Sequence, residues 1–175
     1  SAVAEGDVLS LAADFTDAGT ETAVELASNG SFAAGLTGWT ADAGIQASVQ
    51  NGELVYARNN AAFASAQVRQ TIATQVGKTY QVQADVAGNT HGVMFLVNGS
   101  PQLTYTQAAG RASFTFTATS TSTQLAIGGT NSLVAAFRLD NVSMQVLPHA
   151  VGWSIARGGV TVATGKGDAF DFTPR

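Results

Sequence analysis

The sequence contains no cysteine, which excludes disulfide bonds, thiolate metal sites and a cysteine nucleophile. Charged residues make up only 11% of the 175 residues, well below the share of about 25% in typical soluble domains. The eight lysines and arginines are scattered from Arg58 to Arg175, whereas nucleic acids bind concentrated positive charge. No apolar run approaches the roughly 20 residues that span a membrane. We therefore predict no nucleic-acid partner and no membrane insertion.

Apolar residues, by contrast, are abundant at 45% of the chain, and they alternate with polar residues at a period of two. The clearest case is residues 80–86, in which every second residue is apolar and the residues between them are Gln81, Gln83 and Asp85. Successive side chains of a strand point to opposite faces. This run therefore predicts a strand with one buried face and one solvated face.

The same alternation recurs in short segments that are separated by turn signals. The turn signals are Asn51-Gly52, Gly77-Lys78, Gly88-Asn89, Asn98-Gly99, Ala109-Gly110 and Gly128-Gly129. The alternating apolar residues are Leu54 and Tyr56; Val93, Phe95 and Val97; Leu103 and Tyr105; Phe114 and Phe116; Leu125 and Ile127; and Val142, Met144 and Val146. Many short strands at this spacing indicate an all-β sandwich or barrel. The Ala-rich residues 60–68 are predicted to form a loop or a single helical turn.

Three ordered motifs occur between residues 28 and 146. They are Ser28-Asn29-Gly30-Ser31-Phe32-Ala33-Ala34-Gly35-Leu36-Thr37-Gly38-Trp39; Val68-Arg69-Gln70-Thr71-Ile72 with Gly77-Lys78-Thr79-Tyr80; and Phe137-Arg138-Leu139-Asp140-Asn141-Val142-Ser143. Together they resemble the N-G-x-F-E-x-G-x-x-G-W start, the Q-x-I and G-K-x-Y pair and the closing strand of the carbohydrate-binding modules of cellulases and xylanases. The resemblance implies that residues 24–147 form a galactose-binding-like jelly-roll β-sandwich.

The two ends of the chain carry a second set of strand-like motifs, at residues 4–11, 15–20, 151–155 and 167–174. These motifs resemble the strands of PKD-like or Ig-like repeats from bacterial surface proteins. The resemblance implies a partial Ig-like β-sandwich formed by residues 1–23 and 148–175, with the jelly roll inserted into a loop. In the repeat family further strands follow the F-x-F-T-P segment. We therefore predict that a downstream segment or a neighbouring subunit supplies the missing strands.

The acidic residues and histidines form no catalytic motif. The carboxylates are spread singly along the chain, whereas glycoside hydrolysis needs two that converge. His91 and His149 stand beside Gly92 and Pro148 in turn-like contexts, and no G-x-S-x-G elbow is present. Two carboxylates on opposed strands can still meet in space, but such pairs usually solvate a surface. We predict that the chain is not an enzyme.

Carbohydrate binding uses aromatic rings that stack on sugar C–H faces, and planar amides or carboxylates that bond to hydroxyls. Residues with this chemistry on the expected strands and loops are Tyr56, Arg58, Asn59, Gln83, Asp85, His91, Tyr105 and Gln107. The tyrosines fall on the apolar parity of their strands, so a core position is their alternative interpretation. The alternative interpretation of the polar residues in the 80–86 strand is that they form a solvated face without a ligand. Trp39 and Trp153 are predicted to pack in cores.

The resemblance to carbohydrate-binding modules also implies a structural Ca²⁺ between the opening and closing motifs, held by carboxylate and carbonyl oxygens. Asp140 occupies the matching closing position. The acid of the family opening is replaced by Ala33, so that Glu25 or Asn29 would have to take its place. A second possible calcium cluster comprises Asp14, Asp17 and Glu21.

These observations lead to two functional hypotheses. The first is a non-catalytic carbohydrate-binding or adhesion module of a larger protein, secreted or on a cell surface and of bacterial type, with a glycan or polysaccharide as partner. The alternative is a structural subunit of an extracellular appendage, fibre or virion decoration that assembles with itself through β-strand contacts. One jelly roll hosts many functions, so the fold alone does not decide between them.

Overall fold

The computed structural model describes residues 9–13, 24–58, 66–130, 134–147, 152–157 and 160–166. These residues contain thirteen strands and no helix. The described part of the chain therefore has no helix that could cross a membrane. The chain divides into two compact units, one of residues 23–147 and one that combines residues 1–22 with 148–175. The all-β class predicted from the alternation is thus confirmed.

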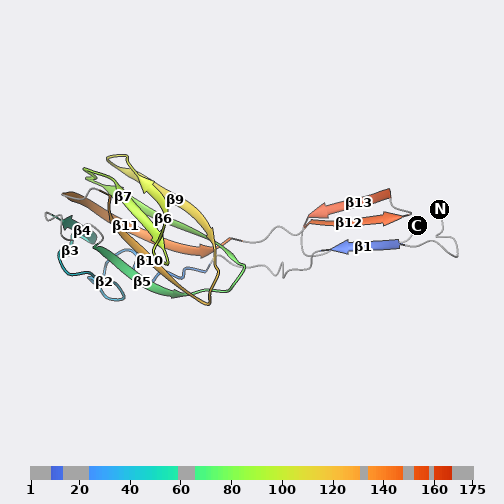
Figure 1. Cartoon of the computed structure of the whole chain (residues 1–175), viewed down its shortest axis with the longest axis horizontal. Coiled ribbons are helices and arrows are strands. Elements are labelled where there is room, and N and C mark those ends of the chain that lie inside the picture. Colours follow the sequence, from blue (N-terminus) through green and yellow to red (C-terminus); the bar gives the residue numbers. More distant parts are fainter. Residues whose placement is uncertain are drawn as a thin grey trace. The chain divides into compact units, whose positions relative to one another are not determined.

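The larger unit is a sandwich of two five-stranded antiparallel sheets (Figure 1). The first, here called the β11 sheet, has the order β3 (Gln46–Gln50), β4 (Glu53–Arg58), β11 (Ala135–Val146), β6 (Thr79–Ala87) and β9 (Gly110–Thr117). The second, the β10 sheet, has the order β2 (Thr40–Ala41), β5 (Gln67–Ala73), β10 (Ser122–Gly129), β7 (Val93–Val97) and β8 (Ser100–Tyr105). Because the chain passes repeatedly from one sheet to the other, the arrangement is a jelly roll.

The core lies between the inner faces of these two sheets. Along β6 every second residue is buried, from Tyr80 to Val86, as the alternation of residues 80–86 predicted. Aromatic pairs fill much of the space: the Tyr56 and Phe137 rings stack with centroids 4.3 Å apart, and those of Tyr80 and Phe116 lie 5.5 Å apart. Such pairs stabilise a core beyond the area that they bury. Trp39 is also buried, at the end of the opening motif.

Two predicted turns have the geometry that their sequence requires. Asn51 and Gly52 have φ angles of 54° and 81°, and Asn98 and Gly99 have φ angles of 50° and 80°. Positive φ at both central residues is typical of the tight turns that join antiparallel strands. These turns fix the register of β3 with β4 and of β7 with β8.

Residues 60–68, predicted to form a loop or a single helical turn, end in a strand. Their last two residues, Gln67 and Val68, already belong to strand β5, and residues 59–65 lie outside the described residues. Val68 is buried and pairs with Ile127 of β10. Tertiary pairing with β10 therefore sets the boundary that the local Ala-rich composition obscured.

The smaller unit is a three-stranded antiparallel sheet in the order β1 (Leu9–Ala13), β12 (Gly152–Arg157) and β13 (Val160–Lys166). Leu9 pairs with Arg157 and Ala13 with Trp153, so the two ends of the chain share one sheet. The Ig-like or PKD-like identity of this unit stays a prediction. The motif at residues 167–174 and the side chain of Trp153 lie outside what the structure describes.

Candidate functional site

Tyr56 and Arg58, both predicted to contact a ligand, point into the sandwich. Their side chains are 0% and 2% exposed. The Tyr56 hydroxyl donates a hydrogen bond to the Ala66 carbonyl at 2.8 Å and accepts one from the Gly129 amide at 3.4 Å. Burial raises the pKa of the Tyr56 phenol. Arg58 donates to the Gly129 carbonyl at 3.5 Å. The inward parity of β4 thus makes both residues part of the core. This confirms the core interpretation of Tyr56 and corrects the ligand-binding prediction for Arg58, and Asn59 lies outside the described residues.

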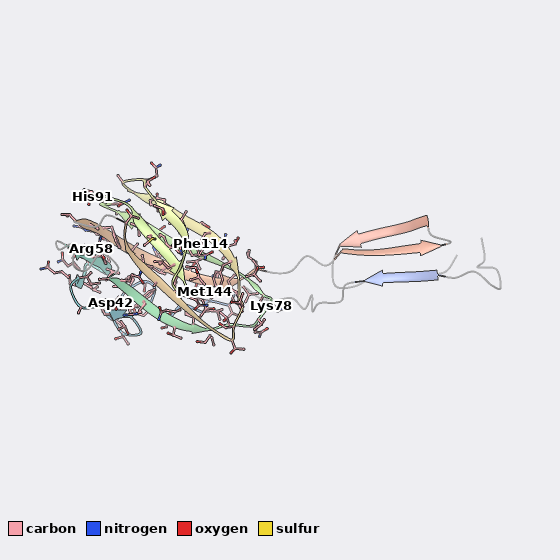
Figure 2. The ribbon with its side chains drawn as sticks, in the orientation of Figure 1. Asp42, Arg58, Lys78, His91, Phe114 and Met144 are labelled. Atoms are coloured by element: carbon pink, nitrogen blue, oxygen red, sulfur yellow. The ribbon has the colours of Figure 1, made fainter. Side chains whose placement is uncertain are left out.

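His91 and Gln107 lie in loops close to Tyr105, the last residue of β8, and Figure 2 shows His91 at the end of the sandwich away from Lys78. Asn89 connects these loops, because its Nδ2 donates to the carbonyls of Tyr105 at 3.1 Å and Gln107 at 2.9 Å. The Tyr105 hydroxyl donates to a backbone carbonyl of its own loop at 3.0 Å. The imidazole of His91 and the side chain of Gln107 are exposed and able to form hydrogen bonds with a ligand.

Gln83 and Asp85 lie on the outer face of the β11 sheet, where they take part in a polar network. Arg111 of β9 reaches Asp85 Oδ1 and Gln83 Oε1, each at 3.2 Å. Asn141 of β11 donates from Nδ2 to Asp85 Oδ2 at 2.9 Å and to Asp140 Oδ2 at 3.2 Å. A β-bulge between Asp140 and Ser143 and a φ of 48° at Asn141 place this amide between the two carboxylates.

Next to this network the structure forms a cavity of about 520 Å³ that is open to solvent, here called the polar hollow. The segment that precedes β2 forms one side of the hollow, and β6, β9 and β11 form the other. Its lining residues are Glu25, Ala27, Asn29, Gly30, Ser31, Gln83, Arg111, Asn141, Val142, Ser143 and Gln145. The hollow therefore joins residues that the sequence analysis placed in separate sugar and calcium sites.

The predicted calcium ligands Asp140, Glu25 and Asn29 serve as structural hydrogen-bond partners. Glu25 Oε1 accepts from the backbone amides of Ala27 at 2.9 Å and Met144 at 2.8 Å. Asn29 donates to two carbonyls of its own loop and accepts from one amide, and Asp140 Oδ1 accepts from the Asn141 amide at 2.7 Å. Among the described residues no three or more Asp, Glu, His or Cys side chains are grouped to hold a metal. The calcium site formed by Asp140, Glu25 and Asn29 stays a prediction.

The other predicted calcium cluster cannot be placed in the same way. Asp14, Asp17 and Glu21 lie outside the described residues.

The outer face of the β10 sheet departs from the alternation seen elsewhere. Ala126 of β10 and Leu96 of β7 point away from the inner core but are only 1% and 5% exposed. The next outward position of β10 is Gly128, where an added Cβ would come within 3.0 Å of atoms of Gln67 and Ala66. On this outer face the small residues of β10 therefore lie between longer residues of β5 and β7 and are covered by neighbouring atoms.

Polar side chains border this surface, which we name the trough and define by Ala126 and Gly128 with their cross-strand neighbours Gln67, Arg69, Met94 and Leu96. Arg69 of β5 forms an ion pair with Asp42, whose carboxylate also accepts from the Gln67 amide at 3.1 Å. Gln124 lies at the outward position that precedes Ala126. The surface thus combines the partly exposed Met94 with guanidinium, carboxylate and amide groups, and the motif analysis identified none of them as ligand contacts.

Comparisons with known proteins place the fold. No family model matches the chain and no curated protein matches it. A solved CBM4 module is similar to it with a TM-score of 0.54 and 16% identity, over 68% of this chain and 98% of that one. The tandem CBM22 domain of Paenibacillus barcinonensis Xyn10C has a TM-score of 0.56 at 16% identity, over 74% of this chain and 47% of its own length.

A third similar structure comes from a virus. The enzymatically active domain of bacteriophage CBA120 tailspike protein 4 has a TM-score of 0.54 at 15% identity, over 71% of this chain and 22% of its own length. At these identities the likenesses show the fold alone. Residues 23–147 therefore have the jelly-roll fold of carbohydrate-binding modules, and that prediction is confirmed.

Proposed function

We propose that residues 23–147 form a non-catalytic carbohydrate-binding module of a larger extracellular protein, and that a polysaccharide chain lies along the trough. The observation that carries the proposal is the group of partly exposed side chains on the outer face of β5, β7 and β10, namely Arg69, Met94 and Gln124, which lie beside the buried Leu96 and Ala126. The CBM4 and CBM22 structures, which share the fold, support the same function. The low charge and the many threonines and serines suit a secreted or cell-surface protein.

The chemistry of the trough matches that of a sugar chain. A sugar ring has an apolar C–H surface and a rim of hydroxyls that both donate and accept hydrogen bonds. The partly exposed side chain of Met94 can cover part of the C–H surface, while Gln124 and the Arg69–Asp42 pair can bond to hydroxyls. None of the residues that define the trough is aromatic, so we expect binding that depends on several consecutive sugar residues.

The test is affinity electrophoresis and calorimetry of the full chain against a panel of soluble plant and bacterial polysaccharides. Arg69→Ala and Gln124→Ala should each weaken binding about three- to ten-fold, the loss expected for one or two hydrogen bonds. Thr115→Ala, at an exposed position of β9 on the opposite outer face, is the matched control. Binding to none of the polysaccharides, or equal binding by all variants, would contradict the proposal.

The non-catalytic character needs its own measurement. Asp85 and Asp140 occupy facing positions of β6 and β11, which is the arrangement that a glycosidase could use. Asn141 bonds to both carboxylates, however, and occupies the space between them. We expect no new reducing ends when the bound polysaccharide is incubated with the chain, and their appearance would show that the module is an enzyme.

The second candidate function is a self-assembling structural subunit of an appendage or virion. The likeness to a tailspike domain supports it, and so does the three-stranded sheet, in which β1 and β13 are the outer described strands. Such strands can pair with a strand of another chain. Light scattering coupled to size-exclusion chromatography distinguishes the candidates: a monomer at high concentration that binds polysaccharide favours the module, and concentration-dependent oligomers without binding favour the subunit.

A further inference from the structure

The polar hollow lies on the opposite sheet from the trough and has walls that are fixed by backbone hydrogen bonds. The Leu26 amide donates to the Met144 carbonyl at 2.9 Å, and the Val142 amide donates to the Gly30 carbonyl at 3.0 Å. An added Cβ at Gly30 would overlap the Val142 carbonyl, so the two walls approach as closely as backbone allows. The hollow is therefore formed before any ligand arrives, which lowers the entropic cost of binding.

The polar side chains inside the hollow are held by one another but retain hydrogen-bonding capacity. Gln83 uses its Oε1 to accept from Arg111, and Asn141 uses its Nδ2 to donate to the two carboxylates. Among the described residues, no hydrogen bond occupies Gln83 Nε2, Asn141 Oδ1 or the hydroxyls of Ser31 and Ser143. Donors and acceptors of fixed position thus face the cavity together.

This donor and acceptor set selects a class of ligand. Among the described residues that line the hollow, Arg111 is the only cation. It is already paired with Asp85 at 3.2 Å, while Glu25 adds a further negative charge. An anionic ligand would meet these carboxylates without a spare cation, and the carboxylates are engaged with N–H groups rather than grouped for a metal. The lining contains no aromatic ring. An uncharged molecule with neighbouring hydroxyls fits this pattern, because each hydroxyl both donates and accepts.

We propose that the polar hollow is a second sugar-binding subsite, which holds one uncharged sugar residue through hydrogen bonds without stacking. The cavity of about 520 Å³ is large enough for one ring and lies within the size range of small-ligand sites. This inference rests on the proposed function, because it takes the chain to be a carbohydrate binder. It extends that function to the β11 sheet, so one module would contact two sugar chains or two parts of a branched one.

The experiment is a titration of the ¹⁵N-labelled full chain, followed by its amide resonances, with methyl glycosides of common hexoses and pentoses. Side-chain and backbone amides of Gln83, Asn141 and Gln145 should shift and saturate with at least one glycoside. Gln83→Met and Ser143→Ala should weaken that binding about three- to ten-fold. Gln81→Met, on the same strand and face but outside the lining, is the control. Thermal melts establish that each variant is folded.

The outcomes separate this inference from the proposed function. If resonances of the trough, such as Ala126 and Gly128, respond to sugars and those of the hollow do not, the second subsite is wrong and the proposed function stands. If only the hollow responds, the subsite stands and the trough is wrong as the binding face. If no glycoside or polysaccharide moves either set, both are overturned. Equal affinity of the Gln83→Met, Ser143→Ala and Gln81→Met variants also overturns the subsite.

Discussion

The outward residues of the two sheets of the jelly roll differ in burial, whereas the inward residues of both sheets are mostly apolar and buried. On the β11 sheet, outward positions such as Gln83, Asp85 and Arg138 are polar and at least partly exposed. On the β10 sheet, outward positions of the two central strands are apolar and buried, at Leu96 and Ala126. A sandwich needs only its inner faces to be apolar. Leu96 and Ala126 are instead covered by neighbouring side chains, so burial on the β10 sheet extends to part of its outer face.

The difference teaches where to look for a ligand in an all-β module whose described aromatic side chains are buried or only partly exposed. Strict alternation is typical of a strand whose outer face contacts only solvent. A break in the alternation on a central strand indicates that the outer face there also contacts something other than solvent. Strand β6 keeps the alternation over its full length, and strands β7 and β10 lose it. Four predictions test whether this contrast reflects stability, binding or both.

The largest expected effect lies on the shared inner face, where the two sheets should be equivalent. Phe95→Ala in β7 and Phe137→Ala in β11 each remove a fully buried ring. Each should lower the free energy of unfolding by about 3–5 kcal/mol, because a cavity is left behind. Urea denaturation of the full chain measures both. A cost below about 1 kcal/mol for either would show that its sheet does not share the core.

The second prediction concerns the outer faces. Leu96→Ala should cost about 2 kcal/mol although Leu96 faces outward, because its side chain is 95% removed from solvent, the complement of its 5% exposure. Arg138→Ala, at an exposed outward position of β11, should change stability by less than about 0.5 kcal/mol. Denaturant midpoints of the two variants give the comparison. Equal costs would mean that the outer faces do not differ in the way their burial indicates.

The third prediction separates a structural role of Asn29 from a metal-binding role. Asn29 Nδ2 donates to the carbonyls of Gly35 and Thr37, both at 2.9 Å, and its Oδ1 accepts from the Ala34 amide at 3.1 Å. Asn29→Asp keeps the acceptor and loses both donors, so it should destabilise the chain by about 1–2 kcal/mol. A calcium ligand would tolerate this change. Unfolding measured with excess calcium and with chelator decides, because calcium-dependent rescue of the variant would contradict the structural role.

The smallest effect is a pH dependence at the end of the sandwich. Burial raises the pKa of Tyr56 above its ordinary value of 10.0. The folded chain therefore holds this proton more tightly than the unfolded chain, and the stability that it contributes is present below pH 10 and declines as the pH rises further. Tyr56→Phe should cost about 1 kcal/mol at neutral pH through two lost hydrogen bonds.

The same variant should also show a shallower loss of stability above pH 10. Urea midpoints at pH 8, 10 and 11 for the wild type and the variant measure this difference. The same alkaline loss in both would assign it to other groups.

The sequence predicted most strands that bury one face, and the turns between them, because these depend on local alternation and on turn residues. The inward positions of Tyr80, Val82 and Ala84 are an example. It did not identify β3, whose inward Ala47 and Val49 give only a weak apolar signal. Strand boundaries set by pairing, such as the start of β5 at Gln67, were also beyond it.

The candidate sites were harder to predict than the strands. Gln83 and Asp85 were selected for their chemistry, but their partners Arg111 and Asn141 come from other strands, and the bulge at Asn141 leaves no signal in a single sequence. Tyr56 was selected for its aromatic ring, which faces the core instead. The trough is a property of three adjacent strands whose pairing in the β10 sheet is not contained in any one of them.

The pairing of β1 with β12 has a consequence for the order in which the chain is made. During synthesis β1 emerges from the ribosome long before its partner, whereas all strands of the jelly roll lie between the two in sequence. The jelly roll joins its own ends through the pairing of Glu25 with Gln145. Once folded, it shortens the loop that β1 and β12 must close from about 140 residues to roughly 20, which lowers the entropic cost by about 2 kcal/mol. Folding of the jelly roll first should therefore favour the later pairing of β1 with β12.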